Sequence, residues 1–203
     1  TFAPQVTFAN GTNPGSSFTR AISIGDFNGD GKPDLAVGKL AQLTPSVPFN
    51  ENDTDISSIL LNTTTTGATT PTFAPKIDFI TGAVPFYVSI GDFNGDGKPD
   101  LVTANIGSKT FSILLNTTPT GGATSTFAPQ VNVTTGSHPG PISIGDFTGD
   151  GKPDLATVNG NSNTASILLN TTITGATTPR NTAAAASSRT VAAADPARYV
   201  QRY

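Results

Sequence analysis

The chain has 203 residues, no Cys, Trp or Met, and a single histidine, His138. These absences exclude disulfide frameworks, thiolate zinc sites and cysteine nucleophiles, and they leave no residue set for a histidine-based catalytic or metal centre. Only 12% of the residues are charged and the formal net charge is -3, which argues against nucleic acid or an anionic membrane as a partner. No apolar segment reaches the roughly 20 residues that span a bilayer. Because Met is absent, we expect a processed or excised piece of a longer protein.

Three sequence elements recur along the chain. Thr-Phe-Ala-Pro begins at Thr1, Thr72 and Thr126, Ser-Ile-Gly-Asp-Phe at Ser23, Ser89 and Ser143, and Ser-Ile-Leu-Leu-Asn-Thr-Thr at Ser58, Ser112 and Ser166. They define three units, residues 1–72, 73–126 and 127–180, followed by an Ala- and Arg-rich tail at 181–203. A period of about 50 residues is typical of a propeller blade.

Each unit contains four short stretches rich in β-branched and aromatic residues and bounded by Gly, Pro, Asn and Thr, which predict strands. In the second unit they cover residues 76–80, 87–91, 100–105 and 110–116. No segment keeps the 3.6-residue period of a helix. The sequence therefore predicts an all-β fold of three four-stranded antiparallel blades. A right-handed parallel β-solenoid is the alternative, although its coils are shorter.

The first unit and the tail depart from the pattern. Extra residues within 39–57 predict a rim loop between the third and fourth strands of the first blade. After Pro179 the repeat stops, because Asn181 stands where the next Phe-Ala-Pro element should begin. The tail is compatible with a linker, a partly helical arm or a strand donated to a neighbour, and the sequence does not choose among them.

One nonapeptide carries most of the acidic residues. Asp-Phe-Asn-Gly-Asp-Gly-Lys-Pro-Asp occupies residues 26–34 and recurs at 92–100 and, with Thr148 at its third position, at 146–154. Oxygen-bearing side chains at positions 1, 3, 5 and 9, with Gly at 6, are spaced as in a calcium loop. Three carboxylates in nine residues repel one another unless a cation or hydrogen bonds compensate. Solvated Asp-Gly turns are the alternative.

We therefore expect about three calcium ions, one per nonapeptide, held by the side chains at positions 1, 3, 5 and 9 and by the carbonyl of the Lys at position 7. The predicted ligands are Asp26, Asn28, Asp30, Lys32 and Asp34, then Asp92, Asn94, Asp96, Lys98 and Asp100, then Asp146, Thr148, Asp150, Lys152 and Asp154. Because a hydroxyl replaces an amide oxygen at Thr148, we expect the third site to be the weakest.

Residues 25–38 resemble the FG-GAP, or VCBS-type, repeat of integrin α-subunit propellers and many secreted microbial proteins. The likeness extends over residues 1–180. It implies that the matching Asp and Asn positions bind Ca²⁺ and that the blades belong to a ring, most often a seven-bladed one. Three blades are fewer than the roughly four to eight that close a ring.

An incomplete ring leaves apolar faces open, because each blade buries its faces only against its neighbours. The candidate inter-blade residues are Ile24, Phe27, Leu35, Val37, Ile59 and Leu61, then Ile90, Phe93, Leu101, Ile113 and Leu115, then Ile144, Phe147, Leu155, Ile167 and Leu169. The chain could be a fragment of a longer propeller, or two chains could close one ring, or unlike ends could join head to tail in a filament. We expect self-association through these open blade edges or the C-terminal tail.

The Thr-, Asn- and Gly-rich surface and the calcium loops predict an extracellular or cell-surface protein. Six Asn-x-Thr sequons are candidate glycosylation sites, at Asn10, Asn52, Asn62, Asn116, Asn132 and Asn170. The leading hypothesis is a secreted calcium-binding repeat protein with a structural or adhesive role, for example as a filament subunit. A lectin-like propeller module and a fragment of a larger surface adhesin, with a glycan or protein ligand, are the alternatives. We expect no enzyme, because the nonapeptides account for the paired carboxylates.

Overall fold

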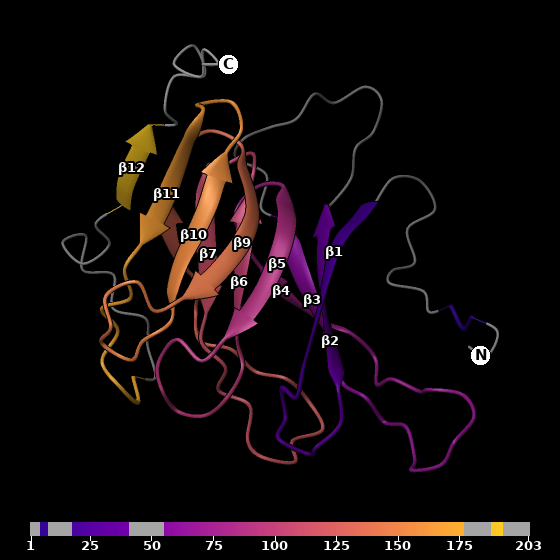
Figure 1. Cartoon of the computed structure of the whole chain (residues 1–203). Helices are drawn as coiled ribbons and strands as arrows, with labels where there is room; N and C mark the ends of the chain where they lie inside the picture. Colours follow the sequence, from indigo (N-terminus) through magenta and orange to yellow (C-terminus); the bar gives the residue numbers. More distant parts are fainter. Residues whose placement is uncertain (1–4, 8–17, 41–54, 177–187, 193–203) are drawn as a thin grey trace, which may run out of the picture.

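The computed structural model describes residues 5–7, 18–40, 55–176 and 188–192. Within these residues, twelve strands form three four-stranded antiparallel sheets, and none of the residues is helical. Figure 1 shows the sheets side by side, with the second between the first and the third, and they do not close into a ring. The predicted all-β fold of propeller-type blades is confirmed, and we call the sheets blades 1, 2 and 3.

In each blade the strands are neighbours in chain order. Blade 1 contains β1 (Phe18–Gly25), β2 (Asp34–Leu40), β3 (Ile56–Leu60) and β4 (Ile77–Ile80); blade 2 contains β5 (Pro85–Gly91), β6 (Asp100–Asn105), β7 (Thr110–Leu114) and β8 (Val131–Thr134); blade 3 contains β9 (Pro139–Gly145), β10 (Asp154–Asn159), β11 (Thr164–Leu168) and β12 (Ser188–Ala192). The extra residues of the first unit lie between β2 and β3, which the sequence predicted as the third and fourth strands of that blade and which are its second and third. Residues 41–54, which include Asn52, lie outside the described part of the chain, as does Asn10.

The blades are offset by one strand from the sequence repeats. The strands after the Thr-Phe-Ala-Pro elements at Thr72 and Thr126 pair with the sheet before them, so that Ile80 of β4 lies opposite Ile56 of β3. The cause is the connection between these strands, which folds back on itself: Thr63 N donates to Thr72 O at 2.9 Å. The blade boundaries predicted at residues 72 and 126 are therefore corrected to the turns at 81–84 and 135–138.

Part of the predicted tail completes blade 3. Strand β12 pairs antiparallel with β11, with Thr190 opposite Ser166. It takes the place that β4 and β8 hold in the other blades, although the Phe-Ala-Pro element that precedes those strands is missing here. Of the three alternatives for the tail, the structure therefore contains a strand, and this strand belongs to the chain's own sheet.

Alternate residues of the central strands fill the two interfaces between blades. Leu101 and Val102 are neighbours on β6 and both are fully buried, because one packs toward blade 1 and the other toward blade 3. The first interface buries Phe27, Ala36, Ile59 and Leu61 of blade 1 against Val88, Leu101 and Leu114 of blade 2; the second buries Phe93, Val102, Ala104, Phe111 and Leu115 of blade 2 against Leu155 and Leu168 of blade 3. Each fully buried Val, Leu, Ile or Phe side chain among them contributes about 1.5–3 kcal/mol, so these contacts dominate the stability of the array.

Two terms describe the faces of a blade. The leading face is the one that, in blades 2 and 3, contacts the preceding blade. The trailing face is the one that, in blades 1 and 2, contacts the following blade. Because the array is not closed, the leading face of blade 1 and the trailing face of blade 3 have no neighbouring blade among the described residues.

Candidate metal-binding loops

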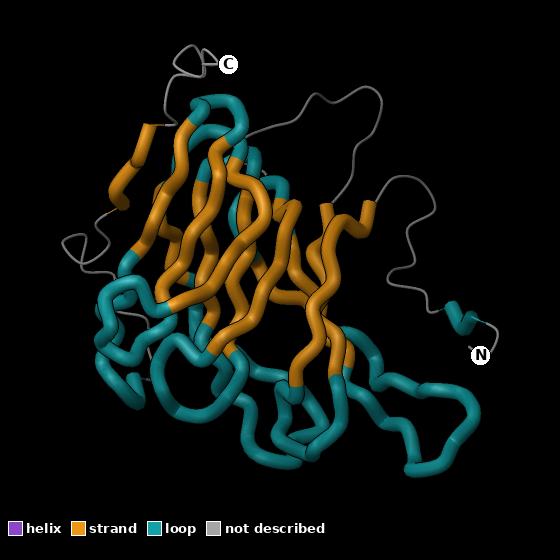
Figure 2. The backbone as a smooth tube through the Cα atoms, viewed as in Figure 1, coloured by secondary structure: helices purple, strands orange, loops and turns teal. Residues whose placement is uncertain are grey.

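The three nonapeptides lie at one end of the blades. Each joins the first strand of its blade to the second, and Figure 2 shows these loops gathered at the same end as the long connections after β3 and β7. In the first loop Gly29 and Gly31 have φ values of 66° and 83°. Only glycine adopts this left-handed region without strain, so the two glycines allow the tight turn that the acidic residues surround.

The carboxylate at position 1 organises each turn through backbone amides. Asp26 accepts hydrogen bonds from Asp30 N at 3.0 Å and from Gly31 N at 2.8 Å, and Asp92 repeats both contacts in the second loop. In the third loop the carboxylate of Asp146 accepts from all four amides of residues 148–151. The N–H of Gly151 contributes most to lowering the pKa of Asp146, and the other three amides act in the same direction. Hydrogen bonds thus compensate part of the negative charge in these loops.

The carboxylate at position 9 is buried behind the loop. Asp100 accepts from Phe93 N at 2.8 Å and from Asn116 N at 2.7 Å, so it ties the start of the loop to the end of β7. Burial raises the pKa of Asp100 to about 7, although both amides act to lower it. Asp34 and Asp154 make the same pair of contacts in their blades, and burial also raises the pKa of Asp34. Position 9 is therefore a structural anchor in all three blades.

The predicted ligands are present in each loop, but their side chains do not converge on a preformed site. Across the described residues, no group of three or more Asp, Glu or His side chains is arranged to hold a metal ion. Asp30, Asp96 and Asp150 at position 5 are exposed, whereas position 9 is turned inward. The donor chemistry nonetheless fits a hard cation such as Ca²⁺, because carboxylate, amide and carbonyl oxygens are its preferred ligands. A carboxylate oxygen that accepts one hydrogen bond also keeps a second lone pair.

The Asn at position 3 has a second role that the sequence did not indicate. Asn28 Nδ2 donates to Gly122 O of blade 2 at 3.0 Å, and Asn94 Nδ2 donates to Ala176 O of blade 3 at 2.8 Å. The side-chain oxygen of each Asn accepts from the amide at position 5. These two Asn residues therefore link successive blades as well as shaping their loops. At the same position of the third loop, Thr148 is exposed.

Asn116 links blades 1 and 2. Its Nδ2 donates to Phe27 O at 2.9 Å and to Pro99 O at 3.1 Å, and its Oδ1 accepts from Thr118 N at 2.9 Å. Only 1% of Asn116 is exposed, so glycosylation at this sequon is incompatible with the folded blade. Sequence reasoning missed this structural role, although the recurrence of Asn two residues after the end of the third strand of every blade was a signal for it. The equivalent Asn170 donates to Phe93 O at 2.9 Å.

The other two described sequons differ in accessibility. Asn62 is half-buried, and its Nδ2 donates to Pro33 O at 2.9 Å within blade 1. Asn132 is exposed on β8, and its Oδ1 accepts a hydrogen bond from Ser112 Oγ at 2.7 Å. By solvent exposure, Asn132 is therefore the most accessible of the described sequons.

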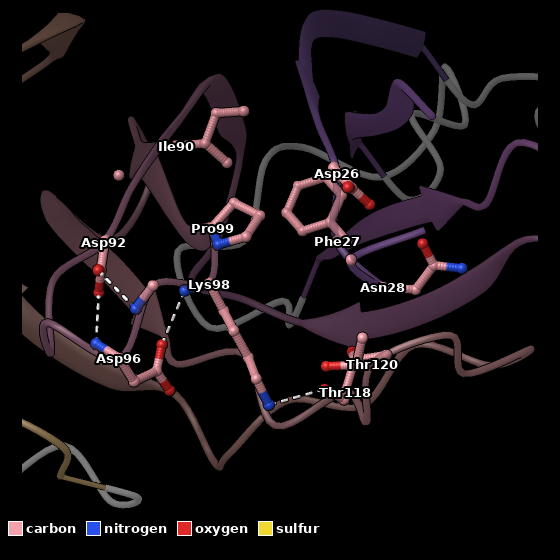
Figure 3. A pocket seen from close by; sticks show the side chains of 13 residues that line it. Asp26, Phe27, Asn28, Ile90, Asp92, Asp96, Lys98, Pro99, Thr118 and Thr120 are labelled. Atoms are coloured by element: carbon pink, nitrogen blue, oxygen red, sulfur yellow. Dashed lines mark hydrogen bonds between the residues drawn. The ribbon is translucent and has the colours of Figure 1, made fainter. Parts of the chain in front are cut away.

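A cleft separates each loop from the next. The cleft between the first and second loops has a volume of about 590 Å³, and the one between the second and third loops about 420 Å³. Figure 3 shows Asp26 on one side of the first cleft and Asp92 and Asp96 on the other, while Lys98 Nζ donates to Thr118 O at 2.8 Å. Because both clefts lie between equivalent loops, they follow from the packing of blade on blade.

Comparison with known families identifies the repeat. Residues 92–157 match the FG-GAP-like repeat model, and residues 18–40 match the FG-GAP repeat model. The first match runs from the second nonapeptide through the third and into β10, and the second covers β1, the first nonapeptide and β2. No curated protein matches the chain significantly. The chain therefore contains FG-GAP-type repeats.

Proposed function

We propose that the chain is an extracellular, calcium-binding repeat module with a structural or adhesive role. FG-GAP repeats are modules of adhesion-type proteins that typically act outside the cell or at its surface. The described residues include no helix that is long and apolar enough to cross a membrane. The only histidine, His138, is exposed in the turn before β9 and has no counterpart in the other blades. The FG-GAP repeats and the isolated position of His138 favour a structural module over an enzyme.

The observation that carries the calcium proposal is the threefold repetition of one acidic loop at one end of the blades. Each loop contains three Asp and one Lys, a formal charge that one Ca²⁺ would neutralise. The side chains at positions 1, 3 and 5, which are Asp, Asn and Asp in the first two loops and Asp, Thr and Asp in the third, would hold the ion together with the carbonyl of the Lys at position 7. The ion would stiffen the loop and reduce repulsion among its carboxylates. Position 9 is already committed to two backbone amides, which keep it beside the loop.

Calcium is expected to raise the thermal stability of the folded chain. At calcium about 100-fold above the dissociation constant, each occupied site adds about 2.7 kcal/mol. Thermal unfolding followed by circular dichroism, in millimolar calcium and after chelation, measures this effect. A triple variant with Asp30→Ala, Asp96→Ala and Asp150→Ala serves as the control, because it removes only exposed side chains. An unchanged melting temperature on chelation of the wild-type protein would contradict the proposal.

The third loop is expected to bind calcium more weakly than the other two. Thr148 supplies a hydroxyl where Asn28 and Asn94 supply an amide oxygen, and its hydroxyl does not accept the position-5 amide as theirs do. Calorimetric titration should therefore resolve two tighter sites and one weaker site, and Thr148→Asn should bring the third site close to the others. Three sites of equal calcium affinity in the wild-type protein would contradict the expected weakening by Thr148.

The clefts between the loops do not favour a lectin. Sugar sites commonly use an exposed aromatic ring for stacking, whereas the aromatic residues that line the two clefts, Phe27 and Phe93, are both buried. We therefore keep the structural or adhesive role as the single proposed function.

A further inference from the structure

The two interfaces within the chain use the same loop contacts. Gly121 N of blade 2 donates to Asn28 O of blade 1 at 2.6 Å, and Gly175 N of blade 3 donates to Asn94 O of blade 2 at 2.7 Å. Likewise, Asn116 Nδ2 donates to Phe27 O, and Asn170 Nδ2 donates to Phe93 O. In both cases the acceptor lies in the loop of the preceding blade. One docking geometry therefore joins each leading face to the trailing face before it.

An isoleucine over a glycine fixes the register of this docking. A Cβ atom added to Gly25 of blade 1 would lie 2.8 Å from Ile90 Cδ1 of blade 2. At the next interface a Cβ atom on Gly91 would lie 3.4 Å from Ile144 Cδ1. The glycine that ends the first strand of a blade thus makes room for the isoleucine of the following blade.

The trailing face of blade 3 carries the same features without a blade on top of them. A Cβ atom on Gly145 would meet nothing closer than the ring of Phe147 at 4.0 Å. Phe147 is 54% exposed, whereas its equivalents Phe27 and Phe93 are 1% and 4% exposed. Val158 is 60% exposed, and the equivalent Ala104 is fully buried. This face therefore presents an apolar surface of the same form as those the internal interfaces bury.

The leading face of blade 1 carries the counterparts. Ile24 is equivalent to Ile90 and Ile144 and is 62% exposed, and Ile22 beside it is 60% exposed. Gly67, the equivalent of the donors Gly121 and Gly175, is also exposed. The isoleucine and the glycine that contact a trailing face at the internal interfaces thus have equivalents on the leading face of blade 1, at the other end of the same chain.

We propose that the trailing face of blade 3 binds the leading face of blade 1 of a second copy of this chain, head to tail and in the register of the internal interfaces. In that register Ile24 of one copy covers Gly145 of the other. Gly67 N donates to Thr148 O, and Asn62 Nδ2 donates to Phe147 O. The contact is heterologous, so repetition produces a closed ring or an open filament. This head-to-tail assembly specifies the structural role proposed above, and its biological meaning rests on that proposed function.

The chain-to-chain contact lacks one hydrogen bond that the internal interfaces contain. Asn28 and Asn94 donate their Nδ2 to the carbonyl after the glycine of the next blade, and Thr148 has no such group. Thr148→Asn is therefore expected to shift association to lower protein concentration by roughly tenfold, the effect of about one hydrogen bond. Sedimentation velocity over a dilution series in chelator measures this shift apart from any effect on calcium. An unchanged or weakened association would contradict the proposed register.

The decisive experiment uses two variants that each block one face. Ile24→Asp places a charge on the leading face of blade 1. Gly145→Val fills the space on the trailing face of blade 3 that Ile24 of a second copy would occupy. Both positions are open in the single chain, so each variant is expected to fold, which circular dichroism verifies. By light scattering, the wild-type protein should exceed the mass of one chain, each variant alone should have the mass of one chain, and an equimolar mixture should form a dimer. The mixture forms because each variant keeps the face that the other has lost.

Ile80→Asp is the matched control. Ile80 is 59% exposed, but the equivalent Thr134 stays exposed in blade 2 although blade 1 covers that leading face. Position 80 therefore lies outside the interface, and this variant should associate as the wild-type protein does. A wild-type chain that stays monomeric at its highest soluble concentration, or a mixture that does not dimerise, would overturn the proposal. With calcium binding intact, either result leaves the proposed function standing; loss of calcium binding with association intact overturns only the calcium proposal.

Discussion

Replacement of Asp100 by Ala is expected to lower the free energy of unfolding by about 3 kcal/mol even when calcium is chelated. The carboxylate accepts from the buried amides of Phe93 and Asn116, and Ala leaves both without a partner. An unpaired buried donor costs about 1–3 kcal/mol, which makes this one of the most damaging single changes in the chain. Urea denaturation in chelator, with the slope of the transition compared between proteins, measures the loss.

Asp96→Ala is the control for this change. Asp96 lies in the same loop but is exposed, and water can replace its hydrogen bonds. Its removal should cost within about 0.5 kcal/mol in chelator. In calcium the Asp96 variant should lose the stabilisation from the second site. Equal losses for Asp96→Ala and Asp100→Ala in chelator would contradict the structural role of position 9.

The effect of Asp100 should also depend on pH. Its pKa in the folded chain, raised by burial to about 7, lies above the ordinary value of 3.8. Between these two values the folded state binds more protons than the unfolded state, so this residue makes the metal-free protein more stable as the pH falls. The Ala variant lacks that dependence, and the cost of the substitution should be larger at about pH 5 than at about pH 8. A larger cost at the higher pH would show that the carboxylate is ionised and well satisfied in the metal-free protein.

Asn116→Ala is expected to cost about 3 kcal/mol, whereas Asn62→Ala at the equivalent position of blade 1 should cost about 1 kcal/mol. Asn116 is buried and satisfies carbonyls in two blades as well as the amide of Thr118. Asn62 is only half-buried and makes its contacts within one blade, to Pro33 O and Thr64 N. The difference measures what the inter-blade contact contributes.

Thermal and urea unfolding of the two variants provide this comparison at a low protein concentration, where the chain is monomeric. The two substitutions remove the same atoms from the same sequence motif, so differences in propensity cancel. Equal losses would mean that the contact between Asn116 and the Phe27 carbonyl contributes little, and the repeated interface would then rest on its apolar residues alone.

All strands but β12 were predictable, because each of the other eleven lies in a copy of one repeat, whereas β12 lies in the tail. The apolar residues of the third strands and the Asp-Gly turns recur in all three units, and the predicted strands at 100–105 and 110–116 match β6 and β7 within two residues. Their assignment to sheets was not predictable, because sequence periodicity does not show at which strand one sheet ends. The fold-back contact of Thr63 with Thr72 decides this, and it depends on backbone geometry.

The loops, too, were predictable only in part. The acidic side chains and their spacing identified three corresponding loops, and the structure places all three at one end of the blades. The sequence could not show that Asp100 faces two amides behind its loop, or that Asn28 reaches the next blade, because both contacts join residues from different segments. Likewise, the sequence predicted Ile24 and Phe147 as inter-blade residues, but only the structure shows that both are exposed, one on the leading face of blade 1 and the other on the trailing face of blade 3.

Equilibrium dialysis against calcium, with the bound metal measured directly, tests the central claim that the nonapeptides are calcium sites. The wild-type chain should bind one ion per loop, and the triple variant at Asp30, Asp96 and Asp150 should show a clear loss of bound calcium. Magnesium at the same concentration should not displace the calcium, because Mg²⁺ requires a smaller and more regular ligand shell. A wild-type chain that binds no calcium at millimolar concentration would contradict the claim and leave the loops as turns held by hydrogen bonds.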